Sequence, residues 1–246
     1  MPLTSNQALI YNKCVSELNL ASASLSPEYY YDSLPQCIID AVYSIGVNYT
    51  STRNTVIRYC ERTDKQRLSN PLGNQSDVHT VNELLTCLSE RADFGAVELF
   101  GNEQKTSSRN GKLKAEAVYE FAQTLYAHNI NTIADIRVAS TTDIARVEKE
   151  IKKIKGQTSG ISFSYFLMLA GNENHMKIDR WLLRFVGEAL NIEKFNDVPQ
   201  AYEDLIAVCN ELKATFPHIT PRLLDHTIWS YIRAKEIKEN NKKNKN

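Results

Sequence analysis

The residues with the clearest chemical potential lie between Gly156 and Asp179. Gly156 and Gly160 bracket a Gln-Thr-Ser tripeptide, and an almost wholly apolar run follows from Ile161 to Ala170. Glycines before a helix permit a tight turn, and the N–H groups of such a turn at a helix N-terminus can bind phosphate. The polar residues 171–174 end this helix, and Asp179 stands where the next amphipathic helix begins. The pattern predicts an anion-binding turn followed by a single carboxylate.

Each of these features also has a purely structural interpretation. Five cations precede the turn and are partly offset by Glu148 and Glu150, so they indicate either a phosphate-binding face or a solvated helix; they are Arg146, Lys149, Lys152, Lys153 and Lys155. An Asp at the start of a helix is a common N-cap. A carboxylate can also stabilise a developing positive charge or activate water. Asp179 can serve in both ways.

These residues resemble the core of the helix-hairpin-helix DNA glycosylase superfamily, to which endonuclease III belongs. In that family a Gly-x-Gly hairpin holds a DNA phosphate, and an essential Asp follows about twenty residues later. Gly160 corresponds to the second hairpin glycine, and Asp179 follows 19 residues after it. Two positions depart from the family pattern. Thr158 replaces the first glycine, and Ser162 stands where bifunctional members have their lyase lysine.

The resemblance implies an all-α, two-lobed helix-hairpin-helix DNA glycosylase-like fold. A six-helix lobe would span 31–172 and end in the helix-hairpin-helix. Residues 1–30 and 173–234 would form a second helical lobe that carries Asp179. Residues 235–246 are rich in Lys and Asn, and their composition predicts a disordered tail.

The resemblance further implies a DNA N-glycosylase that flips a damaged or modified base from double-stranded DNA and hydrolyses its N-glycosidic bond. Asp179 would be the catalytic carboxylate. An abasic site would remain, and lyase activity would be absent because Ser162 carries no amine. The role would be base excision repair or antiviral defence against modified phage DNA. Which base is excised is not indicated by the sequence.

The implied DNA contacts come from two segments. The hairpin would contribute Lys155, Gly156, Thr158, Gly160 and Ser162. Asn48 and Tyr49 follow the Leu34–Ile45 helix, where family members insert a side chain into the gap left by the flipped base. A plain surface turn is an equally good interpretation of these two residues.

Composition sets further bounds. Lys+Arg and Asp+Glu both number 29, so the formal net charge is zero and does not indicate a nucleic-acid partner. The five cysteines are scattered, which favours a reducing cytoplasm over a disulfide framework. The family's iron–sulfur loop needs four closely spaced cysteines near the C-terminus, but only Cys209 lies there. We expect no cofactor, no metal, no membrane span and a cytoplasmic monomer.

Local signals predict where several helices begin. Thr80 with Glu83 forms a capping box, Ser140 and Asp143 cap the helix before the hairpin, and Thr220 precedes a helix that starts at Pro221. The polar stretch 66–77 reads as a loop. Asp225 and His226 look like an acid–imidazole pair. Because neighbours on a helix point apart, we expect structural hydrogen bonds there instead.

Two other classes of function stay open. One is a non-catalytic helix-hairpin-helix protein that binds DNA, with Asp179 acting only as a cap. The other is an all-α module for protein partners, in which the hairpin is coincidental.

Overall fold

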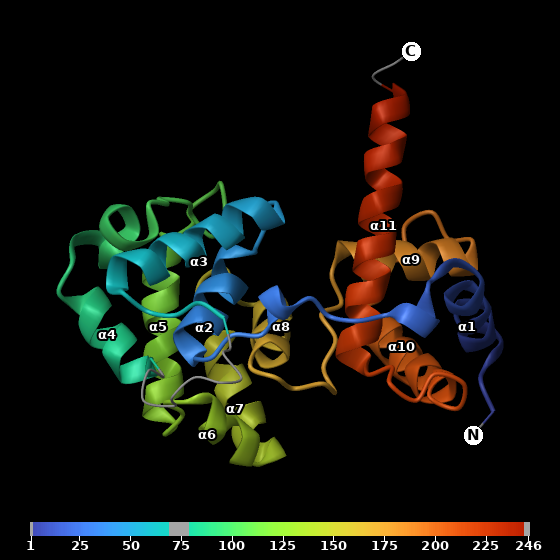
Figure 1. The fold of residues 1–246 in the computed structure, drawn as a ribbon, viewed down its shortest axis with the longest axis horizontal. Coiled ribbons are helices and arrows are strands. Elements are labelled where there is room, and N and C mark those ends of the chain that lie inside the picture. Colours follow the sequence, from blue (N-terminus) through green and yellow to red (C-terminus); the bar gives the residue numbers. More distant parts are fainter. Residues whose placement is uncertain (1, 69–78, 244–246) are drawn as a thin grey trace. The chain divides into compact units, whose positions relative to one another are not determined.

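A computed structural model describes residues 2–68 and 79–243 (Figure 1). The protein is all-α, as predicted. The described ranges contain eleven α-helices and, besides them, short 3₁₀ and π turns and two isolated β-bridges. Residues 69–77 of the expected loop and 244–246 of the expected tail lie outside the described residues.

The chain divides into two compact units. Unit 1 combines Met1–Leu25 with Glu173–Asn246, and unit 2 comprises Ser26–Asn172. The sequence-based division had its boundaries at residues 31 and 172. Each unit has its own cluster of buried apolar side chains.

Unit 2 is organised around α2 (Leu34–Tyr43), all ten of whose residues are buried. It packs against α3 (Tyr49–Thr63), α5 (Lys114–Ala127) and α8 (Ile161–Leu169). A helix that is apolar on nearly all faces is stable only inside a core, which accounts for the position of α2. The remaining elements of unit 2 are η2 (Pro27–Tyr29), α4 (Val81–Ser89), η4 (Ala92–Gly95), η5 (Ala96–Phe100), α6 (Ile133–Val138) and α7 (Thr141–Ile151).

Unit 2 has seven α-helices in its described residues, α2 to α8, where the resemblance implied six. The short helix α6 is one that the sequence patterns above did not single out. Its capping box joins Thr132 and Asp135, and Asp135 accepts backbone N–H groups from Asn131 at 2.9 Å and from Thr132 at 2.7 Å. This local cap starts a separate helix before α7.

Unit 1 contains four α-helices in its described residues: α1 (Ser5–Glu17), α9 (Arg180–Leu190), α10 (Val198–Leu212) and α11 (Pro221–Lys243), with the short turn η1 (Leu20–Ser22) after α1. Helix α1 packs on α9 and α10, and α9 also packs on α11. The N-terminal segment therefore completes a core whose other helices all follow residue 172.

The predicted helix starts are confirmed at three caps. Thr80 and Glu83 form the capping box of α4. The Ser140 hydroxyl accepts the N–H of Asp143 at 3.1 Å, and the Thr220 hydroxyl accepts the N–H of Leu223 at 3.1 Å. The sequence could predict these helix starts because each cap joins residues only three positions apart.

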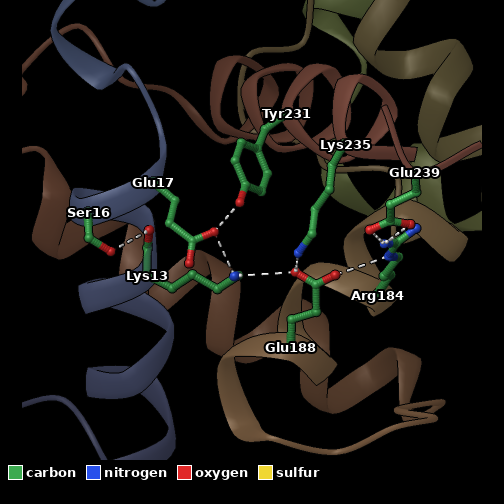
Figure 2. Close-up of polar contacts among 8 residues, drawn as sticks. All are labelled: Lys13, Ser16, Glu17, Arg184, Glu188, Tyr231, Lys235 and Glu239. Carbon is green, nitrogen blue, oxygen red and sulfur yellow. Dashed lines mark hydrogen bonds and ion pairs between the residues drawn. The ribbon is translucent and has the colours of Figure 1, made fainter. Parts of the chain in front are cut away.

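The expected disorder of 235–246 is wrong for the residues that the structure describes, because α11 continues to Lys243. Lys235 Nζ lies 2.8 Å from Glu188 Oε2. Arg184 Nη2 lies 3.0 Å from Glu239 Oε1, which ties the last turns of α11 to α9 (Figure 2). A Lys- and Asn-rich composition could not reveal these partners, because they lie about fifty residues earlier in the chain.

Glu188 is the centre of this ion-pair network. Besides Lys235, its carboxylate contacts Lys13 Nζ at 3.3 Å and Arg184 Nε at 3.1 Å. Glu17 pairs with Lys13 at 2.8 Å and accepts the Tyr231 hydroxyl (Figure 2). Single exposed ion pairs contribute little, whereas a connected network fixes helices relative to each other. We assign this network the structural role of holding α1, α9 and α11 together.

A buried lysine joins the end of α2 to the loop before α3. Lys114 is 1% exposed, and its Nζ donates to the carbonyls of Tyr43 at 3.0 Å and Ile45 at 2.7 Å. Burial lowers the pKa of Lys114 to about 8. The ammonium supplies donors to carbonyls that a helix end leaves unpaired. It thereby fixes the start of the loop that leads to Asn48 and Tyr49.

Candidate functional site

The hairpin connects α7 to α8 through residues 152–160. Gly156 and Gly160 have φ values of +93° and +74°, in the left-handed region that favours glycine. The N–H of Gly160 donates to the carbonyl of Gln157 at 3.0 Å. A Cβ at Gly160 would lie 2.5 Å from Lys152 Cε, so the Lys152 side chain covers this glycine.

This geometry corrects the role expected of Gly160. The residue is buried, and its N–H already has an acceptor within the hairpin. Gly160 therefore serves the turn and the start of α8, and it does not offer its own backbone to a DNA phosphate. The sequence pattern could not show that Gly160 is covered, because the covering side chain belongs to Lys152 at the end of α7, eight residues earlier.

Ser162 is also not available for DNA. It is 2% exposed, and its hydroxyl donates to the side-chain carbonyl of Gln157, which is itself completely buried. The expected DNA contact at Ser162 is thus replaced by a hydrogen bond that holds the hairpin against α8.

The exposed tip of the hairpin keeps the predicted potential for phosphate. Lys155, Gly156, Thr158 and Ser159 are exposed. Within the described parts of the chain, the N–H groups of Thr158 and Ser159 have no hydrogen-bond acceptor. Free N–H groups just before a helix N-terminus favour an anion. The tip, and not Gly160, is the part of this turn that can approach a phosphate.

Most of the cations before the hairpin are paired on their own segment. Lys152 lies 2.6 Å from Glu148, Lys153 lies 2.6 Å from Glu150, and Arg146 lies 3.4 Å from Asp143. Pairs at this spacing on a solvated face are weak and can exchange with other anions. Their presence supports the solvated-face interpretation for these three residues and leaves Lys155 at the exposed tip.

Two glycines with nearly equal φ values provide a matched test of hairpin packing. Gly156 (φ +93°) has Thr106 Cβ 2.4 Å from the position of an added Cβ, whereas Gly171 (φ +92°) has no non-neighbouring atom within 4 Å. Alanine at Gly171 should lower the free energy of unfolding by about 1–2 kcal/mol through backbone strain alone. Alanine at Gly156 should cost about 1–3 kcal/mol more through overpacking. Urea unfolding of both variants measures the difference, and equal losses would show that Thr106 does not restrain the hairpin.

Asn48 and Tyr49 lie at the start of α3, in the same unit as the hairpin. The Asn48 side chain is exposed, but its Oδ1 accepts the N–H of Ser51 at 2.9 Å as the N-cap of α3. The half-buried Tyr49 ring lies 5.7 Å from the Tyr29 ring at an angle of 32°. Both residues therefore have structural contacts, and their expected insertion into DNA stays a prediction.

Asp179 lies in unit 1, immediately before α9. Its Oδ1 accepts the N–H of Trp181 at 2.8 Å, so the residue is an N-cap. Its Oδ2 lies 3.7 Å from Lys177 Nζ, and the carboxylate is 17% exposed. One oxygen is thus fixed by the helix while the other faces a cation. A carboxylate held in this way has a defined orientation and one oxygen available for electrostatic chemistry.

A second carboxyl group, on α11, contacts the backbone two residues before Asp179. Asp225 of α11 is 7% exposed, and its Oδ2 accepts the N–H of Lys177 at 2.6 Å. Burial, together with the negative charge of Asp179, raises the pKa of Asp225 to about 8. The predicted structural hydrogen bond is confirmed here. The proximity to Asp179 was not predicted, because it depends on folding that brings together residues 46 positions apart.

Aromatic side chains lie against cations both directly after Asp179 and on α11. The Arg180 guanidinium lies 4.5 Å from the Trp181 ring, just after Asp179. On α11, the His226 ring stacks on Trp229 at 5.5 Å, and the Arg233 guanidinium lies 5.0 Å from the same indole. Such pairs present flat, positively charged surfaces that suit phosphates and bases.

Among the residues described, no group of three or more His, Cys, Asp or Glu side chains is arranged to hold a metal ion. Over the same ranges, no helix combines the length and apolar character that crossing a bilayer requires.

Comparison with known proteins identifies one family. Neither a curated protein nor a solved structure matches the chain. A family model described as "Domain of unknown function (DUF8548)" matches residues 8–233. This range includes the hairpin, Asp179 and Asp225, and it covers more than half of the chain. The chain therefore belongs to the DUF8548 family.

Proposed function

We propose that the protein is a DNA N-glycosylase in which Asp179 acts on the sugar of an extruded nucleotide. The observation that carries this proposal is the Asp179 carboxylate, whose Oδ1 is fixed by the N–H of Trp181 and whose Oδ2 faces Lys177. The position of Asp179, 19 residues after Gly160, and the division into two helical units support the proposal of a glycosylase-like fold.

The chemistry requires one oriented carboxylate. Breaking an N-glycosidic bond builds positive charge on the deoxyribose, and Asp179 would stabilise that charge or activate the attacking water. In the free protein the cation nearest to Asp179 Oδ2 is the ammonium of Lys177. A developing sugar cation would compete for the same oxygen. The base must first leave the helical stack, because the reacting bond is inaccessible within a duplex.

DNA binding would use the exposed tip of the hairpin. The N–H groups of Thr158 and Ser159 and the ammonium of Lys155 would contact a phosphate. Arg180 offers a further cation directly beside Asp179. Contacts of this kind hold a duplex without reading its sequence, and their strength falls as the salt concentration rises.

Incubation with a panel of modified duplexes tests the proposal. The panel contains uracil, alkylated purines, oxidised bases and hypermodified cytosines, and alkaline treatment then reveals abasic sites. We expect release of one class of base, with the strand intact until alkali is added. Binding without release of any base would reject the enzymatic part of the proposal.

Borohydride trapping in the same reactions tests the expected absence of lyase activity. A lyase forms a Schiff base through an amine, and Ser162 cannot supply one. A trapped adduct would contradict the monofunctional assignment. Its loss in Lys177→Ala but not in Lys155→Ala would then identify the amine that lies 3.7 Å from Asp179.

A non-catalytic DNA-binding protein is the second candidate, because Asp179 makes an N-cap hydrogen bond that is sufficient to explain its presence. Salt-dependent retardation of undamaged duplex, together with a failure to release any base from the panel, would favour it. An absence of retardation at low salt would instead favour a protein-interaction module.

A further inference from the structure

Two side chains on the first turns of α11 hold the segment that carries Asp179. Arg222 Nη1 lies 2.8 Å from Glu173 Oε1, and the N–H of Arg222 donates to the Glu173 carbonyl at 3.1 Å. Three residues later, Asp225 Oδ2 accepts the N–H of Lys177 at 2.6 Å. Residues three apart lie on one face of a helix. This face of α11 therefore binds the 173–177 segment at both of its ends.

The backbone connects these contacts to Asp179. The N–H of Asp179 donates to the carbonyl of Lys177 at 2.7 Å, so these two residues form one tight turn. The side chain of Lys177 contacts the Asp179 carboxylate at 3.7 Å. Any displacement of Lys177 from Asp225 would move both partners of this contact.

An aspartate is unusual at position 225 because the site is buried. Asp225 is 7% exposed, and burying a charged carboxylate is costly unless it is paired. The charged groups that act on it are Asp179 and Lys177, both from the segment before α9. Helices α9 and α10 pack on α11, but among the described residues no charged side chain of either helix acts on Asp225. A neutral acid meets these conditions best, because it accepts the N–H of Lys177 without repelling Asp179.

We propose that Asp225 is a positioning residue for Asp179: as a neutral carboxylic acid it holds the Lys177–Asp179 turn against α11 and leaves Asp179 as the single negative charge of the site. Ionisation of Asp225 would add a buried negative charge that the charge of Asp179 repels, and loosening of the turn would relieve the repulsion. The expected consequence for base excision depends on the proposed function, whereas the consequence for the turn does not.

The first experiment uses the protein alone. Hydrogen exchange of the 173–181 segment should be much faster in Asp225→Leu, which cannot accept the N–H of Lys177, than in Asp225→Asn, which can. Asp204→Asn is the matched control: Asp204 is 1% exposed on α10 in the same unit and accepts Gln7 Nε2 at 2.9 Å. Equal protection of this segment in Asp225→Leu and the wild type would overturn the positioning role.

The second readout is pH dependence. The pKa of Asp225 is raised to about 8 from an ordinary value of 3.8, so the folded protein binds an extra proton between about pH 4 and pH 8. The stability that this proton confers is present at low pH and is lost as the pH rises through that window. Urea midpoints should therefore fall from pH 5 to pH 8.5 more in the wild type and in Asp204→Asn than in Asp225→Asn. Identical pH slopes in the wild type and Asp225→Asn would overturn the neutral state.

The third readout applies to a base that the panel identifies. Excision by the wild type should slow as the pH rises from 7 to 9, and Asp225→Asn should lose this dependence. Asp225→Leu should be about 100-fold slower at pH 7, as expected for a displaced catalytic group. Retention of the wild-type pH profile in Asp225→Asn would overturn the link to Asp179. If no base is released, the first two readouts still decide the positioning role, while the proposed function fails separately.

Discussion

Asp179→Asn should reduce base excision by about 10²–10³-fold, while the fold and the affinity for DNA stay close to those of the wild type. Asn is nearly isosteric with Asp and is an equally good N-cap, so the hydrogen bond to the N–H of Trp181 is kept. Only the negative charge is lost. Removing one preorganised electrostatic contact from a transition state costs roughly 3–4 kcal/mol, whereas losing a cap costs about 1 kcal/mol. Single-turnover excision and thermal unfolding measure the two effects separately.

Asp197→Asn is the matched control for this variant. Asp197 is the N-cap of α10 in the same unit, and its Oδ1 accepts the N–H of Gln200 at 3.0 Å. Both substitutions exchange a capping carboxylate for a carboxamide, but we propose a chemical role only for Asp179. Excision by Asp197→Asn should equal that of the wild type. If Asp179→Asn also excised its base at close to the wild-type rate, Asp179 would be reduced to a helix cap and the glycosylase proposal would lose its main support.

The elements that depend on neighbouring residues could be predicted from the sequence. The caps of α4, α7 and α11 each involve residues three positions apart, and the apolar run of α8 shows its burial directly. Asp179 could also be recognised as the start of a helix, because its cap hydrogen bond joins residues only two positions apart. The chemical role of Asp179 rests on a resemblance in spacing, and the structure adds its orientation and its contact with Lys177.

The features that depend on contacts beyond one helical turn could not be predicted. Gly160 looked like an open backbone position, but the side chain of Lys152 covers it. Residues 235–243 looked disordered because their composition is polar, yet Lys235 and Glu239 pair with Glu188 and Arg184 on another helix. Periodicity and composition describe one segment at a time. Partners that fold over from elsewhere in the chain leave no mark in that segment.

Lys114 is the clearest example of such a hidden role. At the start of α5 it reads as an ordinary surface lysine, like Lys112 two positions earlier. Only Lys112, which lies just before the helix, pairs with carboxylates of α5, including Glu116 at 3.3 Å. Lys114 instead turns inward and donates to the carbonyls of Tyr43 and Ile45. Two lysines that are two positions apart therefore differ completely in what their removal should do.

Lys114→Met should lower the free energy of unfolding of unit 2 by roughly 2–6 kcal/mol, because each of the two carbonyls left without a donor costs about 1–3 kcal/mol. Met fills a similar length and has no donor, so the change isolates the lost hydrogen bonds from the lost volume. Lys112→Met, which breaks only the partly exposed ion pairs with Glu116 and Glu120, should cost at most about 1 kcal/mol. Urea unfolding measures both variants, and hydrogen exchange of residues 44–49 shows whether the loop before Asn48 loosens. An unfolding midpoint in Lys114→Met equal to that of Lys112→Met would mean that the carbonyls of Tyr43 and Ile45 do not depend on the buried ammonium. In that case the loop before Asn48 and Tyr49 must be held by other contacts, such as the hydrogen bond that the N–H of Ser51 donates to Asn48 Oδ1.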